Sequence, residues 1–439
     1  MTAQLRKVWL DLKGSYWFIP AVLTVLAFAL AVATIQLDRA WGPQWLAELG
    51  LEASRPEGAR AQLTVVTTGM IAVSSTLFAI TIAAVAFASG NYGPRLLTNF
   101  MNDRGNQVSL GVFVATFVYN LMLLRVVRDP VDSRPETPVE AVPAFVPQLS
   151  MLVSGASVAI AVATLVYFLH HIPASIRINS VLAGIGRRLV RDIEERFPAK
   201  GGATEPRPTV PGEPVTAEKI GYIEIIEFAA LDRLARECGG TIALKARTGD
   251  FVHPHRPLAV VAGVAPDERL KERIRAAFSL GASRTPTQDL EFLIDELVEI
   301  GLRALSPGIN DPFTAVTSIH WMGAAMAKLA ERDLCRGPEQ ESYDPERVQV
   351  VADDFPHFLN RSFGAMRPSV AGSALAAKMF LEALWGVAIG ATSRGRRDAI
   401  LREARLLVRQ AETALEGPAL EEVRERLAQF EERMAGVEG

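Results

Sequence analysis

Five polar residues around one turn form the densest group of side chains that could do chemistry in this sequence. They are Arg284, Asp289, Arg303, Asn310 and Asp311. An Asp followed by Pro is typical of a helix N-terminus, where free backbone N–H groups attract anions. This pattern indicates a site for a ligand or for another subunit. A capped turn between two helices, with Glu299 and Arg303 four residues apart as a helix pair, explains the same residues without a ligand.

A second group consists of hydroxyl and amide side chains inside very apolar segments. The group contains Thr67, Ser74 and Thr81, which recur every seven residues on one helical face, together with Asn120, Ser154 and Ser157. Polar groups inside a membrane usually face other helices or water. The residues therefore predict either closely packed helices joined by hydrogen bonds or a hydrated path for a solute or ion.

No motif of a known reaction accompanies these groups. The chain contains no nucleophile elbow, P-loop, HExxH sequence or CxxC pair, so we expect no catalytic residue and an enzyme is the least favoured function. His253-Pro254-His255 lacks further ligands, so we expect no metal and no other cofactor. A net charge of -3 gives no reason to expect nucleic acid as a partner.

Four long segments without charged side chains carry the hydroxyl groups. They cover residues 14–37, 61–94, 105–124 and 141–176. A helix of about 20 apolar residues crosses a hydrocarbon core of about 30 Å, so residues 1–176 are expected to form a domain of four transmembrane helices in the lipid bilayer. Lys and Arg near the first and after the last segment predict a multi-pass membrane protein with both termini in the cytoplasm.

The rest of the chain is charged and rich in proline. We expect a connecting helix and a Pro/Gly-rich linker over 177–217, a small β-rich unit resembling a sandwich or barrel over 218–265, and a helical cytoplasmic domain over 266–439. The apolar segment 372–391 contains Lys378 and Glu382, which favours a soluble core helix over a fifth span. The fold class is thus an α-helical membrane protein with a cytoplasmic α+β region that ends in a helical bundle.

Two motifs connect this chain with a known group of proteins. One is the link Gly93-Pro94-Arg95-Leu96-Leu97, which leads to Gln107, and the other is the ten-residue sequence from Arg303 to Pro312. Together with the four spans, they resemble a bacterial family of predicted membrane proteins labelled domain of unknown function 2254. The resemblance covers nearly the whole chain and implies an integral membrane protein. It implies no established activity and therefore assigns no functional residue.

Two functions fit these observations. The hydroxyl-lined faces favour an oligomeric channel or conduit for a solute or ion, regulated by the cytoplasmic domain. The alternative is a membrane-anchored sensor or scaffold that binds a ligand or partner through that domain. Apolar residues at heptad-like spacing from Leu420 to Phe430 indicate a terminal helix for packing or oligomerisation, and we expect a homo-oligomer in both cases. The partners expected are the bilayer, a second copy of the chain and an unidentified small ligand or ion.

Overall fold

The computed structural model describes residues 12, 15–41, 54–93, 103–129, 144–197, 211–334, 343–351 and 354–437. The chain divides into two compact units. The N-terminal unit comprises Asp11–Gly90 and Pro94–Arg177, and the C-terminal unit comprises mainly Ile178–Gly439, together with Met1–Leu10 and Asn91–Gly93. Most of the expected Pro/Gly-rich linker and of the Gly-Pro-Arg link lies outside the described residues.

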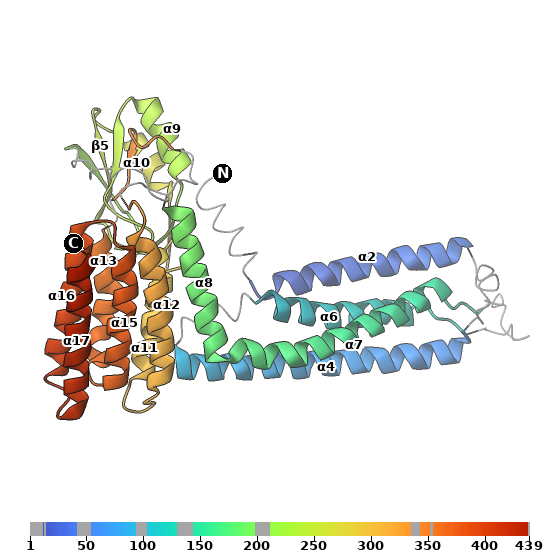
Figure 1. Ribbon diagram of the computed structural model, residues 1–439. Coiled ribbons are helices and arrows are strands. Elements are labelled where there is room, and N and C mark those ends of the chain that lie inside the picture. The colour runs from blue at the N-terminus through green and yellow to red at the C-terminus, as the bar shows by residue number, and fades with distance from the viewer. Residues whose placement is uncertain are drawn as a thin grey trace, which may run out of the picture. The chain divides into compact units, whose positions relative to one another are not determined.

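Four helices form the N-terminal unit. They are α2 (Phe18–Trp41), α4 (Pro56–Tyr92), α6 (Arg104–Leu124) and α7 (Gln148–Ile176), and Figure 1 shows them running side by side. All four are long and apolar enough to cross a membrane, which confirms the four predicted spans. Their outer faces expose large apolar side chains such as Val25, Val65 and Val166. Such a surface is suited to lipid rather than to water.

Helices also make up most of the C-terminal unit. The long ones are α8 (Ile178–Arg196), α11 (Leu290–Ala304), α12 (Pro312–Ala330), α15 (Ala374–Gly390), α16 (Arg394–Ala411) and α17 (Pro418–Val437). The short helix α13 (Phe355–Leu359), a π-helical turn η1 (Asn360–Gly364) and α14 (Ala365–Val370) connect α12 to α15. In Figure 1 α11, α12, α15, α16 and α17 lie beside one another as a bundle.

The apolar helix α15 lies inside this bundle. It packs against α12 on one side and against α16 and α17 on the other. Its two charged residues reach the neighbouring helix, because Lys378 forms an ion pair with Glu422 and Glu382 forms one with Arg426. The helix is absent from the candidate spans among the described residues. The packing of α15 among α12, α16 and α17 agrees with the expectation that this segment is a core helix.

Two small sheets complete the C-terminal unit. The first contains β1 (Glu213–Thr216), β5 (Pro257–Ala262), β3 (Thr241–Leu244) and β7 (Val348–Gln349), in that order. The second contains β4 (Phe251–Val252), β2 (Gly221–Ile226) and β6 (Phe278–Gly281). Residues of both sheets share one hydrophobic cluster with α9 (Phe228–Cys238) and α10 (Glu268–Arg275), which gives this part of the unit a single core.

Three of the strands lie outside the range from which the sequence predicted β structure. Strand β1 belongs to the expected linker, whereas β6 and β7 belong to the part expected to be helical. The expectation of a helical domain from residue 266 onwards was wrong at Phe278, because α10 ends at Arg275 and Phe278 pairs with Ile226 of β2. The spacing of apolar residues favoured a helix there. Whether a segment forms a strand also depends on a second strand, distant in sequence, that hydrogen-bonds with its backbone N–H and C=O groups.

Candidate functional site

A network of charged side chains surrounds the N-terminus of α11. Arg284 donates from Nε to Asp289 Oδ2 over 2.7 Å and from Nη1 to Asp295 Oδ2 over 2.6 Å. Arg361 of η1 binds Asp295 with two nitrogens, at 2.8 and 2.7 Å, and its Nη1 lies 2.9 Å from Glu291 Oε2. Two arginines are thus held by three carboxylates of one helix start, and the pair of Arg361 with Asp295 has the bidentate geometry that makes such pairs strong.

The network also joins the β-rich part to the bundle. His357 Nε2 of α13 lies 2.7 Å from Glu291 Oε1, and Arg247, which follows β3, approaches the same oxygen to 3.9 Å. Thr248 next to it donates to the carbonyl oxygen of Gln288 over 2.8 Å. Side chains from four elements therefore meet at one place, namely the β3–β4 loop, α11, α13 and η1. A change of charge on one of these side chains would alter the electrostatic energy of the others.

Asp289 is the most buried member of this network. Its carboxylate accepts a hydrogen bond from Phe292 N over 3.2 Å and so caps α11. Burial raises the pKa of Asp289 to about 6, against the opposing effect of the Arg284 guanidinium. This carboxyl therefore changes its charge close to neutral pH.

The structure divides the five residues that the sequence grouped together. Arg284 and Asp289 meet at the start of α11, whereas Arg303, Asn310 and Asp311 lie at its end and in the following turn. With 15 residues α11 is about 22 Å long, at about 1.5 Å per residue. The polar residues therefore form two separate groups, not one site around the turn.

The turn after α11 is accounted for by its own hydrogen bonds. The Asp311 carboxylate accepts from Thr314 N over 3.1 Å and from Thr314 Oγ1 over 2.6 Å, and the Thr314 hydroxyl bond lowers the pKa of Asp311. Asn310 has a left-handed φ of 49°, a conformation that asparagine tolerates better than most residues. Arg303 Nε lies 3.5 Å from Glu299 Oε1. The predicted helix cap and helix pair are both confirmed.

Hydrogen bonds also engage most of the polar residues of the N-terminal unit. The hydroxyls of Ser74, Thr81 and Ser157 each donate to a backbone carbonyl of their own helix, three or four residues earlier. Ser154 Oγ of α7 donates to Asn120 Oδ1 of α6 over 2.5 Å, and both residues are fully buried. The hydroxyl oxygen of Thr67 is buried without a hydrogen-bond partner among the described residues. Asn120 and Ser154 thus join two helices, as helix packing requires.

Asp38 joins two helices of this unit, and the sequence did not single it out. It lies near the end of α2, and its buried carboxylate accepts from Leu149 N, Ser150 N and Ser150 Oγ over 2.8, 2.9 and 2.6 Å. The residue before α7 is Pro147, which offers no capping side chain. A helix from elsewhere in the chain therefore supplies the cap of α7. The missing local cap before Gln148 was the available signal.

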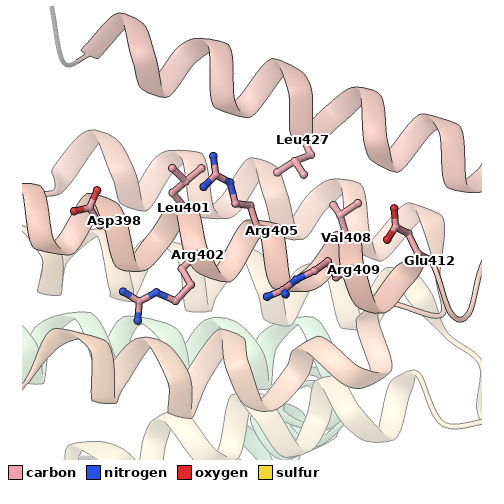
Figure 2. Close-up of a pocket in the computed structure, with 8 residues that line it drawn as sticks. All are labelled: Asp398, Leu401, Arg402, Arg405, Val408, Arg409, Glu412 and Leu427. Carbon is pink, nitrogen blue, oxygen red and sulfur yellow. The ribbon is translucent and has the colours of Figure 1, made fainter.

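A cavity of about 720 Å³ lies between α16 and α17. Figure 2 shows the residues that line it. In Figure 2 Leu401 and Val408 point from α16 towards Leu427 of α17, while Arg402 and Arg409 extend from the other side of α16. A third arginine of the lining, Arg405, is bound to Glu431 over 2.7 Å. Arg402 and Arg409 have no ion-pair partner in the described part of the chain. The cavity thus combines an apolar wall with arginines, two of them without an ion pair among the described residues, and its lining also includes the carboxylates of Asp398 and Glu412.

Comparison with known proteins agrees with the membrane assignment. Residues 13–385 match the model of a family described as "Predicted membrane protein (DUF2254)". Proteins of Mycobacterium bovis and Mycobacterium tuberculosis, both described as uncharacterized, are 28% identical over 418 residues, which are 93% of this chain and 78% of theirs. No solved structure matches the chain.

Proposed function

Because the chain belongs to the DUF2254 family of predicted membrane proteins, we propose that it is a membrane-anchored binding protein. Its four apolar helices hold it in the bilayer, and its C-terminal unit takes up a ligand that combines an anionic group with an apolar part. This is the sensor or scaffold function of the two that the sequence left open. The ligand class follows from the cavity between α16 and α17.

One observation carries this proposal, namely that the lining of one cavity contains apolar side chains and two arginines that have no ion-pair partner among the described residues. Arg402 and Arg409 are seven residues apart, which places them on one helical face with about 10 Å between them along the axis. Guanidinium groups bind phosphate and carboxylate oxygens in pairs. A cavity of about 720 Å³ lies in the size range of small-molecule sites, roughly 300–1,000 Å³.

The test compares three probes on the purified full chain in detergent. Hexyl phosphate carries both features of the ligand, inorganic phosphate only the charge, and hexanol only the apolar part. We expect hexyl phosphate to raise the thermal unfolding temperature most. Arg402→Gln combined with Arg409→Gln should abolish that rise, whereas Arg394→Gln, on the same helix but outside the cavity lining, should preserve it. An equal response of the double variant would refute the proposal.

A conduit is the second candidate function, and the observation that favours it is Thr67. Its hydroxyl is buried without a partner in the described residues, on the face that also carries Ser74 and Thr81. An unsatisfied hydroxyl inside a bundle is a place where water can bind. The hydrogen bonds of Ser74, Thr81 and Asn120 within and between helices leave few polar atoms for a path, so we rank the conduit second.

Ion or solute flux into liposomes tests the conduit. If protein-containing liposomes leak no faster than empty ones across a set of small ions, this function is excluded for those ions. If they do leak, Thr67→Val should reduce the flux and leave assembly unchanged, because valine has the shape of threonine without its hydroxyl. Thr24→Val is a matched control, since Thr24 of α2 already donates to its own backbone at Pro20.

Location and assembly belong to the same proposal. We place the protein in the bacterial inner membrane with both termini and the C-terminal unit in the cytoplasm, on the distribution of Lys and Arg. We further propose a homo-oligomer, which native mass spectrometry of the detergent-solubilised protein would detect. If only the monomer is detected at all protein concentrations, the proposed homo-oligomer is refuted.

A further inference from the structure

We propose that the turn between α11 and α12 is a lipid anchor, which inserts Ile309 and Phe313 into the membrane interface and so fixes the C-terminal unit on the bilayer surface. This anchor is separate from the cavity between α16 and α17 and does not depend on it. It assigns a role to the exposed apolar side chains in and directly after the motif from Arg303 to Pro312. The backbone hydrogen bonds of this motif explain the shape of the turn but not the exposure of these side chains.

The turn presents large apolar side chains to the outside. Phe313 is 72% exposed and Ile309 is 47% exposed, whereas most large apolar residues of the bundle are buried. Their backbone is held firmly, because Asn310 N donates to Ser306 O over 2.9 Å and Asp311 N donates to Ala304 O over 2.8 Å. Exposure of these two apolar side chains to water is unfavourable, whereas their insertion into a lipid interface is favourable.

Helix α8 determines at which end of the unit this turn lies. At the C-terminal end of α8, Arg196 donates to Gln288 O just before α11 over 3.1 Å. Arg332, just after α12, donates to Phe197 O over 2.9 Å. The start of α11 and the end of α12 therefore lie beside the C-terminal end of α8. Their opposite ends, which the turn connects, must lie towards the beginning of α8.

One close contact gives the height of Phe313 along α8. Gly186 lies directly against the Trp321 ring of α12, so that a Cβ atom there would clash with the indole. Eight residues before Gly186 is Ile178, and eight residues before Trp321 is Phe313. Eight residues of helix span about 12 Å, and α8 and α12 run in the same direction. Phe313 is therefore roughly level with Ile178.

Ile178 is the residue at which the unit joins the membrane part of the chain. Only Arg177 separates it from Ile176, the last residue of the candidate span α7. The exposed turn thus occupies the end of the unit at which the chain arrives from the bilayer. This continuity with a span favours lipid as the occupant over a second copy of the chain. Arg177, directly before Ile178, adds a cationic group suited to anionic headgroups.

The anchor can be tested with a fluorescent probe in proteoliposomes. Full-length protein with Cys238→Ser and Cys335→Ser receives a single cysteine by Phe313→Cys, labelled with a nitrobenzoxadiazole dye. Phe251→Cys is the matched control, since Phe251 is 45% exposed but lies on β4 in the β-rich part. We expect lipids with a spin label near the headgroup to quench the dye at least twofold more at position 313 than at position 251. Ile309→Cys gives a second reading of the same turn.

Two outcomes would overturn the proposal. Equal quenching at positions 313 and 251 would mean that the turn stays in water. A dye at position 313 that is shielded from water yet not quenched by lipid, together with disulfide cross-linking of 313 to 313, would mean that the turn contacts a second copy instead. Labelled variants are compared only where their thermal unfolding matches that of the unlabelled protein, so a loss of fold is not counted as either result.

Discussion

Replacing Asp38 with alanine should destabilise the N-terminal unit more than removing any exposed acid near it. The carboxylate accepts from two backbone N–H groups and one hydroxyl at the start of α7, and it is buried. Loss of a helix cap costs about 0.5–2 kcal/mol. A buried donor left without a partner costs about 1–3 kcal/mol, although the Ser150 hydroxyl can turn to another acceptor. We therefore expect Asp38→Ala to reduce the free energy of unfolding by about 2–4 kcal/mol.

A graded series makes this prediction specific. Asp38→Asn keeps one carbonyl oxygen and can hold one N–H group, so its cost should be smaller, about 1 kcal/mol. Asp129→Ala is the control, because Asp129 pairs with Arg60 over 3.1 Å with both side chains 48% exposed. An exposed ion pair contributes about 0.2–1 kcal/mol. The order of stability should be wild type, Asp129→Ala, Asp38→Asn and then Asp38→Ala, with the middle two close together.

The assay is reversible unfolding in mixed micelles, in which sodium dodecyl sulfate is titrated into protein held in maltoside detergent and helix content is followed by circular dichroism. The midpoints are converted to free energies with one common slope, provided that the slopes of the variants agree. If Asp38→Ala shifts the midpoint no further than Asp129→Ala does, then the cap of α7 by α2 contributes nothing, and the reasoning from its three hydrogen bonds is refuted.

Four further predictions concern Asp289, the turn after α11, the hydrogen bond between Ser154 and Asn120, and the membrane topology. Burial raises the pKa of Asp289 to about 6, above the ordinary value near 3.9. The protonated carboxyl therefore stabilises the fold fully below about pH 4, and this contribution is lost as the pH rises through about 6. In urea titrations, the free energy of unfolding of Asp289→Asn should rise by about 2–3 kcal/mol relative to that of wild type between pH 4 and pH 7, and a constant difference would contradict this. Asp311→Ala should lower the free energy of unfolding by about 0.5–2 kcal/mol through loss of the α12 cap, whereas Arg303→Ala should cost about 0.2–1 kcal/mol, both measured by thermal melts; equal effects would argue against the cap. Ser154→Ala should cost about 0.6 kcal/mol in the micelle assay, the average for a hydrogen bond between spans, and Asn120→Ala in that background should cost less than it does alone. Reporter fusions after Lys13 and after Gly201 should read as cytoplasmic and one within residues 136–142 as external, and a cytoplasmic signal from the middle fusion would overturn the topology of four spans.

The candidate sites could be predicted only where their partners are close in sequence. The cap of α12 by Asp311 was predictable because Thr314 is three residues away, as was the pair of Glu299 and Arg303 within one helix. Asp295 and Arg361 were not predicted, since their bidentate contact joins α11 to a π-helical turn 66 residues later. The sequence could not distinguish Arg402 and Arg409 from the other arginines of the basic stretch. Only the tertiary structure places Glu431 next to Arg405, and not next to either of these two residues.

The sequence by itself determined the four spans, the boundary near residue 177 and most of the helices of the bundle. Spans are determined by length and apolar composition, and helices by a spacing of three to four residues, so both are properties of a single segment. Only the tertiary structure decided that Phe278 begins a strand, that Asp38 caps a helix 110 residues away, and that the five polar residues lie at two ends of α11. Each of these depends on which distant backbone or side-chain group satisfies a donor or acceptor, and that pairing is settled only when the chain has folded.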